Sequence, residues 1–203
     1  MNKAVIIDYN MGNLASVAKA LKQIGINYII SNSADEIESS SHLILPGVGS
    51  FKQGMNNLKE LGLIEILNSE VVRNKKPFLG ICLGMQLIAT SGTEPQKCIG
   101  LNWIKGMVTK IETKKSQLPL PHLGWNSVNF LNEKFQNFDK KDFYFIHSYH
   151  FNVEEKDKIS ATFNYGQKMV AAISYKNINA VQFHPEKSQK FGLNLLKSFL
   201  NNA

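Results

Sequence analysis

The sequence predicts an α/β fold built on a parallel β-sheet. Short runs rich in β-branched residues alternate with helical patterns through the first half of the chain, which is typical of a sheet covered by helices. The chain of 203 residues is 43% hydrophobic and 10% aromatic, which is enough for one buried core and too apolar for a disordered protein. We therefore expect a single domain over residues 1–203.

The first half begins with an expected strand at residues 4–8, followed by an amphipathic helix. Asn13 can cap this helix, apolar residues recur along it at helical spacing, and Gly25 ends it. Further strands are expected at residues 28–30, 43–45 and 77–82. A second amphipathic helix is expected from about residue 54 to residue 73.

After Gly92 the pattern changes to short strands with few helical segments. These strands are expected at residues 107–111, 143–147, 161–163, 170–174 and 180–183, before a closing helix at residues 191–200. Residues 114–121 are too few, and too apolar at their end, to separate domains. We interpret them as a surface loop.

Cysteine content and charge exclude several classes of protein. Cys82 and Cys98 cannot form a disulfide framework for this length, and the chain opens on a strand-like run, so we expect a cytoplasmic protein. No apolar run approaches the ~20 residues of a membrane span, so we expect no membrane partner. The formal charge is +7, but Arg73 is the one arginine and the lysines are scattered. We therefore expect a solvated surface and no nucleic-acid partner.

The most informative motif is Gly80-Ile-Cys-Leu-Gly-Met-Gln86, which places a cysteine between two glycines where a predicted strand meets a helical pattern. This pattern is typical of a nucleophile elbow, in which glycines relieve crowding around a strained turn. A helix N-terminus beside Cys82 would favour the thiolate, and the next backbone N–H could help to hold an oxyanion. Alone, the motif fits a buried structural cysteine equally well.

A thiolate nucleophile needs a base, and Phe183-His-Pro-Glu186 supplies one together with a carboxylate. Pro185 disfavours a helix, so we expect an extended segment in which His184 and Glu186 point the same way. This arrangement suits an imidazole held by a carboxylate. The alternative is an ordinary turn at the end of a strand.

Two further motifs carry weaker signals. Pro46-Gly-Val-Gly49 follows a predicted strand, and its backbone N–H groups could complete an oxyanion hole, although a plain turn explains it as well. His147-Ser-Tyr-His150 has the spacing of a metal site but lacks a nearby Cys or carboxylate cluster, which favours a strand or rim segment. We therefore expect no metal and no cofactor.

The remaining candidate side chains favour structural roles. We interpret Cys98 as a packed thiol, because it has neither a glycine elbow nor a local base. Trp125 is interpreted as a core or interface residue. His42 and His122 have no obvious partners in the sequence.

Together these motifs resemble those of the class I (Triad) glutamine amidotransferases, and most closely the glutaminase subunits of imidazole glycerol phosphate synthases. The resemblance implies a flavodoxin-like α/β fold, with a mostly parallel central sheet flanked by helices and an additional smaller antiparallel sheet. The Cys82 elbow and His184-Pro-Glu186 are shared across the class. The matching segments cover nearly the whole chain: 8–14, 46–49, 80–86, 121–126, 145–149 and 181–188.

The resemblance also implies the roles of individual residues. Cys82 would attack the side-chain amide of L-glutamine, His184 would act as acid and base, and Glu186 would orient His184. Gly49 would belong to the oxyanion strand. Glutamine would be bound by Gly49, Gln86, Glu94, Ser148 and Tyr149.

Free ammonia near pH 7 is mostly ammonium, so such a glutaminase gains from passing ammonia directly to a partner. In the resembled enzyme the partner is a (β/α)₈-barrel cyclase, which forms a heterodimer with the glutaminase and makes imidazole glycerol phosphate and aminoimidazole carboxamide ribotide in histidine biosynthesis. The 203 residues leave no room for such a synthase. Candidate interface residues are His122, Trp125, Tyr149 and Lys187.

The sequence departs from the family pattern at Asn10, at residues 93–97, which include Pro95, and at His150. These departures leave open a paralogue that supplies ammonia to a different synthase, such as a sugar amidotransferase for surface glycans. A stand-alone thiol hydrolase for γ-glutamyl compounds is a further alternative, which would act without a partner.

Overall fold

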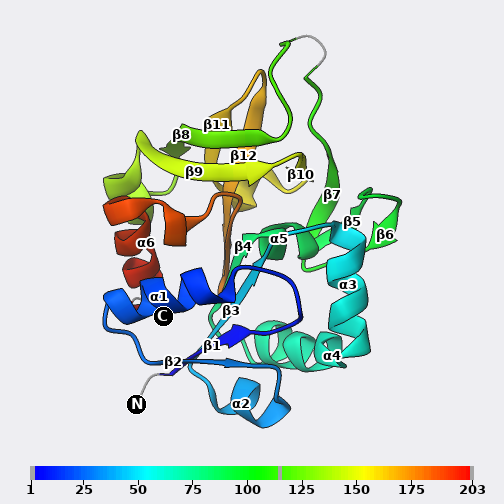
Figure 1. The fold of residues 1–203 in the computed structure, drawn as a ribbon, viewed down its shortest axis with the longest axis vertical. Coiled ribbons are helices and arrows are strands. Elements are labelled where there is room, and N and C mark those ends of the chain that lie inside the picture. The colour runs from blue at the N-terminus through cyan, green and yellow to red at the C-terminus, as the bar shows by residue number, and fades with distance from the viewer. Residues whose placement is uncertain (1–2, 114–115, 202–203) are drawn as a thin grey trace.

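The centre of the molecule is a large twisted sheet, seen in a computed structural model that describes residues 3–113 and 116–201 (Figure 1). Within the described residues the sheet has nine strands, in the order β2-β1-β3-β4-β13-β12-β11-β8-β9. Its five strands from β2 to β13 are parallel, and β12, β11, β8 and β9 continue the sheet in antiparallel pairing. The strands are β1 (Ala4–Ile7), β2 (Tyr28–Ser31), β3 (His42–Gly47), β4 (Phe78–Cys82), β8 (His122–Phe130), β9 (Lys141–His147), β11 (Ile159–Asn164), β12 (Lys168–Tyr175) and β13 (Ile178–Val181).

The parallel half has a hydrophobic core on each face, because the side chains of β1, β3 and β4 are buried on both sides. Successive side chains of β1 alternate, so that Ile6 joins one core and Ile7 joins the other. The helices α1 (Leu14–Gln23) and α6 (Gln189–Asn201) cover the first core, and α3 (Phe51–Glu60) and α4 (Leu63–Leu67) cover the second (Figure 1). The predicted α/β class is confirmed.

The single helix expected from about residue 54 to residue 73 is wrong. Helix α3 ends at Glu60, and Gly62 has a φ of +68°, in the left-handed region where glycine carries little strain. After α4, residues 68–73 form a π-helical turn. Apolar residues recur at helical spacing on both sides of Gly62, so this spacing alone predicts one continuous helix and does not indicate the break.

A second, smaller sheet of the described residues packs beside the parallel half, in the order β10-β7-β5-β6. Its strands are β5 (Ala89–Gly92), β6 (Cys98–Ile99), β7 (Ile104–Lys110) and β10 (Tyr149–Val153). Pairing is antiparallel for β10 with β7 and for β5 with β6, and parallel for β5 with β7. The expected loop at 114–121 connects β7 to β8. Residues 116–121 contain no helix or strand, and Lys114 and Lys115 lie outside the described residues.

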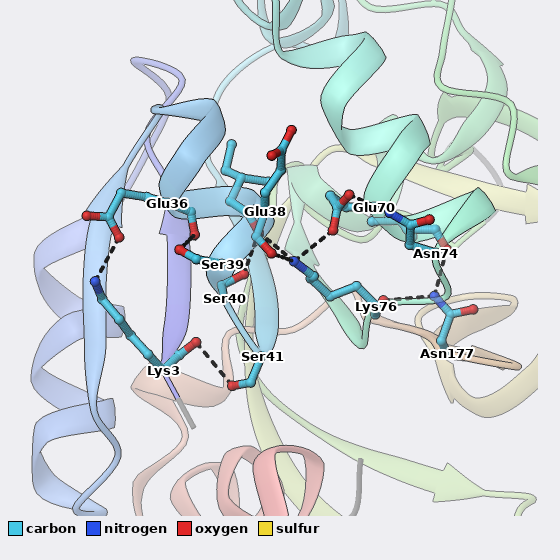
Figure 2. Close-up of polar contacts among 12 residues, drawn as sticks. Lys3, Glu36, Glu38, Ser39, Ser40, Ser41, Glu70, Asn74, Lys76 and Asn177 are labelled. Atoms are coloured by element: carbon cyan, nitrogen blue, oxygen red, sulfur yellow. Dashed lines mark hydrogen bonds and ion pairs between the residues drawn. The ribbon is translucent and has the colours of Figure 1, made fainter. Parts of the chain in front are cut away.

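A partly buried lysine ties the short helix α2 (Ala34–Ser39) to the turn before β4 (Figure 2). Lys76 Nζ donates to the carbonyl oxygens of Ile37 at 2.7 Å and Glu38 at 2.6 Å, near the end of α2. It also pairs with Glu70 Oε2 at 2.7 Å, and the two side chains are only 10% and 7% exposed. The cation therefore satisfies helix carbonyls and a buried carboxylate together.

No helix in the described part of the chain has the length and apolar character needed to cross a membrane.

Candidate active site

Cys82 lies on a sharp turn between β4 and the short helix α5 (Leu83–Leu87). Its φ of +53° and ψ of −103° are strained for any residue that carries a Cβ atom. The two flanking glycines permit this turn by close packing. A Cβ on Gly84 would lie 1.8 Å from the carbonyl oxygen of Leu45, and a Cβ on Gly80 would lie 2.8 Å from that of Gly84. Cys82 therefore has the geometry of a nucleophile elbow.

His184 reaches the same end of the sheet because β13 pairs in parallel with β4, with Val181 opposite Ile81. His184 Nδ1 lies 2.7 Å from Glu186 Oε1, and both side chains are almost fully buried. The expected pairing is therefore present, but the extended backbone is wrong. Residues 185–187 form a 3₁₀ turn with Pro185 in its first position, where proline is tolerated because no N–H is needed.

The charges around His184 favour its protonated form. Burial alone would lower the pKa of the imidazole, but the neighbouring Cys82 thiolate and the Glu186 carboxylate outweigh burial and raise this pKa to about 10. His184 Nε2 and Glu186 Oε2 have no hydrogen-bond partner within the described residues. The geometry fits a thiolate–imidazolium pair whose second ring nitrogen is held by a carboxylate.

Asn13 has a role that the sequence did not indicate. It occupies the N-cap position of α1, as expected, but its side chain makes no capping hydrogen bond. Instead Asn13 Nδ2 donates to Glu186 Oε1 at 3.4 Å. Asn13 therefore helps to hold the carboxylate that holds His184.

A cavity of about 200 Å³ opens beside Cys82. Its lining brings together all five residues expected to bind glutamine, which come from distant parts of the chain. Val48, Leu83, Ile146 and His147 complete the wall. The lining residues expected from the sequence are Gly49, Cys82, Gln86, Glu94, Ser148 and Tyr149.

Polar contacts fix two of these lining residues. Gln86 Nε2 donates to the carbonyl oxygen of Tyr149 at 3.0 Å and to Gln182 Oε1 at 3.1 Å. Both amide hydrogens of Gln86 are thus engaged, which leaves its oxygen to accept a ligand donor. The Phe51 N–H donates to Glu94 Oε2 at 3.3 Å. This hydrogen bond lowers the pKa of the Glu94 carboxyl, but burial outweighs it, and the pKa is raised.

Two buried residues near the sulfur were missed by sequence reasoning. Gln182 Nε2 lies 3.7 Å from Cys82 Sγ, in position to donate to it. Gln182 is the one polar residue in the run Ala180-Val-Gln-Phe183, which directly precedes His184, and this contrast is the signal that could have revealed it. Tyr9 is fully buried and its hydroxyl has no partner within the described residues. Burial, and then the charge of Cys82, raise the pKa of Tyr9 well above its usual range.

His122 has a partner, contrary to the reading of the sequence. Its Nδ1 lies 3.1 Å from His147 Nε2, and both side chains are buried. Burial lowers the pKa of His122 to about 4 and that of His147 to about 3, so both rings are neutral near pH 7. A surface position for His122 at an interface is therefore excluded in the free chain.

The other candidates lie as follows. His147 ends β9, Ser148 lies in a bend, and Tyr149 and His150 begin β10, so the His-Ser-Tyr-His segment joins the ends of two strands. The described residues contain no group of three or more His, Cys, Asp or Glu side chains that could hold a metal ion. Trp125 lies on β8, is 48% exposed and contacts Tyr144 edge to face, which favours the interface over the core.

Comparisons with known proteins agree with this geometry. Residues 5–203 match the family model described as glutamine amidotransferase class-I. The chain is 50% identical to imidazole glycerol phosphate synthase subunit HisH 1 of Campylobacter jejuni (strain RM1221), over 96% of this chain and 98% of that protein. It is 45% identical to subunit HisH 2 of Methanococcus maripaludis, over 98% of each chain.

Solved structures show the same fold at low sequence identity. A structure titled "Crystal structure of glutamine amidotransferase" superposes with a TM-score of 0.76 at 18% identity, covering 97% of each chain. The structure of PurLQS from Thermotoga maritima gives a TM-score of 0.75 at 15% identity, covering 99% of this chain and 98% of that one. Because the family model matches residues 5–203, nearly the whole of this chain, the chain belongs to the class I glutamine amidotransferases.

Proposed function

We propose that the protein is the glutaminase subunit of an imidazole glycerol phosphate synthase, which hydrolyses L-glutamine to glutamate and ammonia. The observation that carries this proposal is the Cys82 elbow, lying beside the buried His184–Glu186 pair at the wall of a cavity. The relatives named HisH, at 45 to 50% identity over nearly the whole chain, support the same function. Both cysteines are free, which suits a reducing cytoplasm.

The residues divide the reaction into two steps. The Cys82 thiolate attacks the side-chain carbonyl carbon of glutamine, and the C–N bond breaks as the His184 imidazolium gives its proton to the departing ammonia. A γ-glutamyl thioester remains on Cys82. Neutral His184 then takes a proton from water as the water attacks the thioester, which releases glutamate and restores the thiolate–imidazolium pair.

The cavity wall supplies groups that match a glutamine substrate. Glu94 and the free oxygen of Gln86 can accept hydrogen bonds from the α-ammonium group. Backbone N–H groups at Leu83 and Gly49 are our candidates for the oxyanion hole, because Leu83 directly follows the nucleophile and Gly49 lines the same cavity. Ser148, in the bend between β9 and β10, and Tyr149, at the start of β10, form a further part of the wall.

The ammonia product needs an acceptor, and an exposed apolar surface reaches the cavity. Leu123 and Ile146 face each other across β8 and β9, and their exposed fractions are 60% and 37%. Trp125 extends this surface, and Lys187 stands over the ring of Tyr144 at its edge. Because Ile146 also lines the glutamine cavity, we propose that the (β/α)₈-barrel cyclase docks here to form a heterodimer.

An ammonia-transfer assay tests the proposal. The purified chain is mixed with a barrel cyclase or with a sugar amidotransferase, and glutamate release and ammonia incorporation are both measured. We expect strong glutaminase activity and product only with the cyclase. Activation by the sugar enzyme alone would identify the paralogue, and full turnover without any partner would identify a stand-alone hydrolase.

A further inference from the structure

The carbonyl oxygen of Tyr149 is held from two sides at the wall of the glutamine cavity. Gln86 Nε2 approaches it at 3.0 Å and His147 Nδ1 at 2.8 Å. A carbonyl oxygen can only accept hydrogen bonds, so His147 must carry its proton on Nδ1. A neutral imidazole has one N–H, and Nε2 of His147 is therefore an acceptor.

This assignment sets the direction of every further hydrogen bond. His122 Nδ1 lies 3.1 Å from His147 Nε2 and must donate to it, which makes His122 Nε2 an acceptor. Asn126 Nδ2, 3.4 Å away, is the donor to that nitrogen. The second hydrogen of the same amide reaches the carbonyl oxygen of Asn164 at 2.9 Å. The chain is thus fully satisfied in one direction, from Asn126 to Tyr149.

Packing fixes the rings in place. The His122 ring stacks on Phe145, Phe163 and Tyr165, with centroid distances of 4.9, 5.4 and 4.0 Å. Rotation of His122 would break these stacks, and rotation of His147 would leave the Tyr149 carbonyl with Gln86 alone. A buried polar chain of this kind specifies one arrangement, because any break leaves an unsatisfied group.

On the far side of Tyr149 a second acceptor holds the Gln86 amide. Gln86 Nε2 also donates to Gln182 Oε1 at 3.1 Å, so both hydrogens of the amide are fixed. The position of the Tyr149 carbonyl therefore decides where the Gln86 amide lies, and hence which of its atoms faces the cavity.

We propose that His122 and His147 are positioning residues for the glutamine cavity: a neutral, one-directional histidine pair that fixes the Tyr149 carbonyl and, through it, Gln86. This inference rests on the proposed glutaminase function. It assigns the pair to substrate binding, so the pair acts on the affinity for glutamine and leaves the reactivity of the Cys82 thiol unchanged.

The test is covalent labelling of Cys82 in the full chain by a diazoketone analogue of L-glutamine, followed by mass spectrometry. Labelling by iodoacetamide reports the reactivity of the thiol alone. His147→Gln places an amide near Nε2 but loses the donor at Nδ1, so we expect the half-saturating analogue concentration to rise about five- to tenfold. His147→Asn keeps an N–H at the Nδ1 position, and we expect a rise of at most about twofold.

Two further variants complete the test. His122→Phe keeps the aromatic stack but removes the donor to His147, and we expect about a threefold rise in the half-saturating concentration. His42→Asn changes another buried histidine, which contacts Phe199 in the core and does not line the cavity, and should leave labelling unchanged. Iodoacetamide should label every variant at the same rate.

Several results would overturn the inference. One is an unchanged half-saturating concentration in His147→Gln or in His122→Phe. Another is an equal rise in His147→Gln and His147→Asn. A third is a loss of iodoacetamide labelling in these variants that matches their loss of labelling by the analogue. If His147→Gln does not fold, His122→Phe decides the question. A different result concerns the function itself. If the unaltered chain reacts with iodoacetamide but shows no saturable labelling by the analogue, the glutaminase proposal fails, and the inference fails with it.

Discussion

Replacing Glu186 by glutamine tests how the charge of one buried carboxylate controls the reaction. The carboxylate lies 2.7 Å from His184 Nδ1, and the two side chains are 1% and 2% exposed, so water screens their attraction very little. Glu186→Gln keeps the size and the contact and removes the charge. The change therefore isolates the electrostatic contribution of Glu186 to the pKa of His184.

The sign of the effect follows from the causes of the raised pKa. In the proposed reaction His184 must be protonated to supply the leaving ammonia, so we expect activity to be lost as the pH rises through its pKa, near 10 in the folded protein. Burial opposes the charged ring, and with Glu186 neutral the Cys82 thiolate alone counters burial. We expect the alkaline limb of the pH–activity profile to move down by about one to three pH units.

The maximal rate should fall as well. A glutamine amide can turn its N–H towards His184 Nδ1, which places the ring proton on Nε2 and prevents that atom from taking a proton from water. We expect kcat for glutamate release to fall about 10²- to 10⁴-fold and remain detectable.

The assay is glutamate release at saturating glutamine, from neutral to alkaline pH, in the presence of the partner. Glu36→Gln is the matched control, because Glu36 pairs with Lys3 at an exposed site. An alkaline limb that stays in place in Glu186→Gln would refute the electrostatic reasoning. A loss as complete as that of a Cys82 variant would refute the assignment of Glu186 as a positioning residue.

Three further changes probe the site and the fold. Cys82→Ala should abolish glutamate release, whereas Cys98→Ala should leave it unchanged, and equal losses would contradict Cys82 as the nucleophile. Lys76→Met leaves the Glu70 carboxylate buried without its cation, so urea denaturation should show a free energy of unfolding that is lower by about 3–5 kcal/mol. The control Lys3→Met breaks an exposed ion pair and should lower it by at most about 1 kcal/mol. Gly84→Ala would place a Cβ 1.8 Å from a backbone oxygen of β3. We therefore expect the free energy of unfolding to fall by about 3 kcal/mol and glutamate release to be lost. Unchanged stability and activity would show that the elbow tolerates a side chain.

The parallel half of the sheet was predictable because β1, β3 and β4 are buried on both faces and are therefore apolar runs in the sequence. The strand expected at 4–8 corresponds to β1, and the strand at 77–82 to β4. The Cys82 elbow was predictable because the backbone packs too closely at Gly80 and Gly84 for any side chain, so both glycines are required in the sequence. A feature of the site could be predicted from the sequence where all the residues that it requires lie in one short segment.

Strand β8 was not predicted because its pattern is inverted. Its inward side chains include the polar His122 and Asn126, whereas Leu123 and Trp125 point outward. A strand with polar residues inside is stable here only because those residues bind one another and His147. That partnership joins segments far apart in the chain, and no local pattern contains it.

The place of β13 in the sheet has a consequence for synthesis. Gln182 and Cys82 are 100 residues apart, yet β13 lies between β4 and β12 in the middle of the large sheet. During translation Cys82 therefore leaves the ribosome long before His184, and the sheet stays open at its centre until residues 178–181 insert. Cys82 gains the neighbouring His184–Glu186 pair only when nearly all of the fold exists, so an incomplete chain holds the cysteine without its proposed catalytic partners.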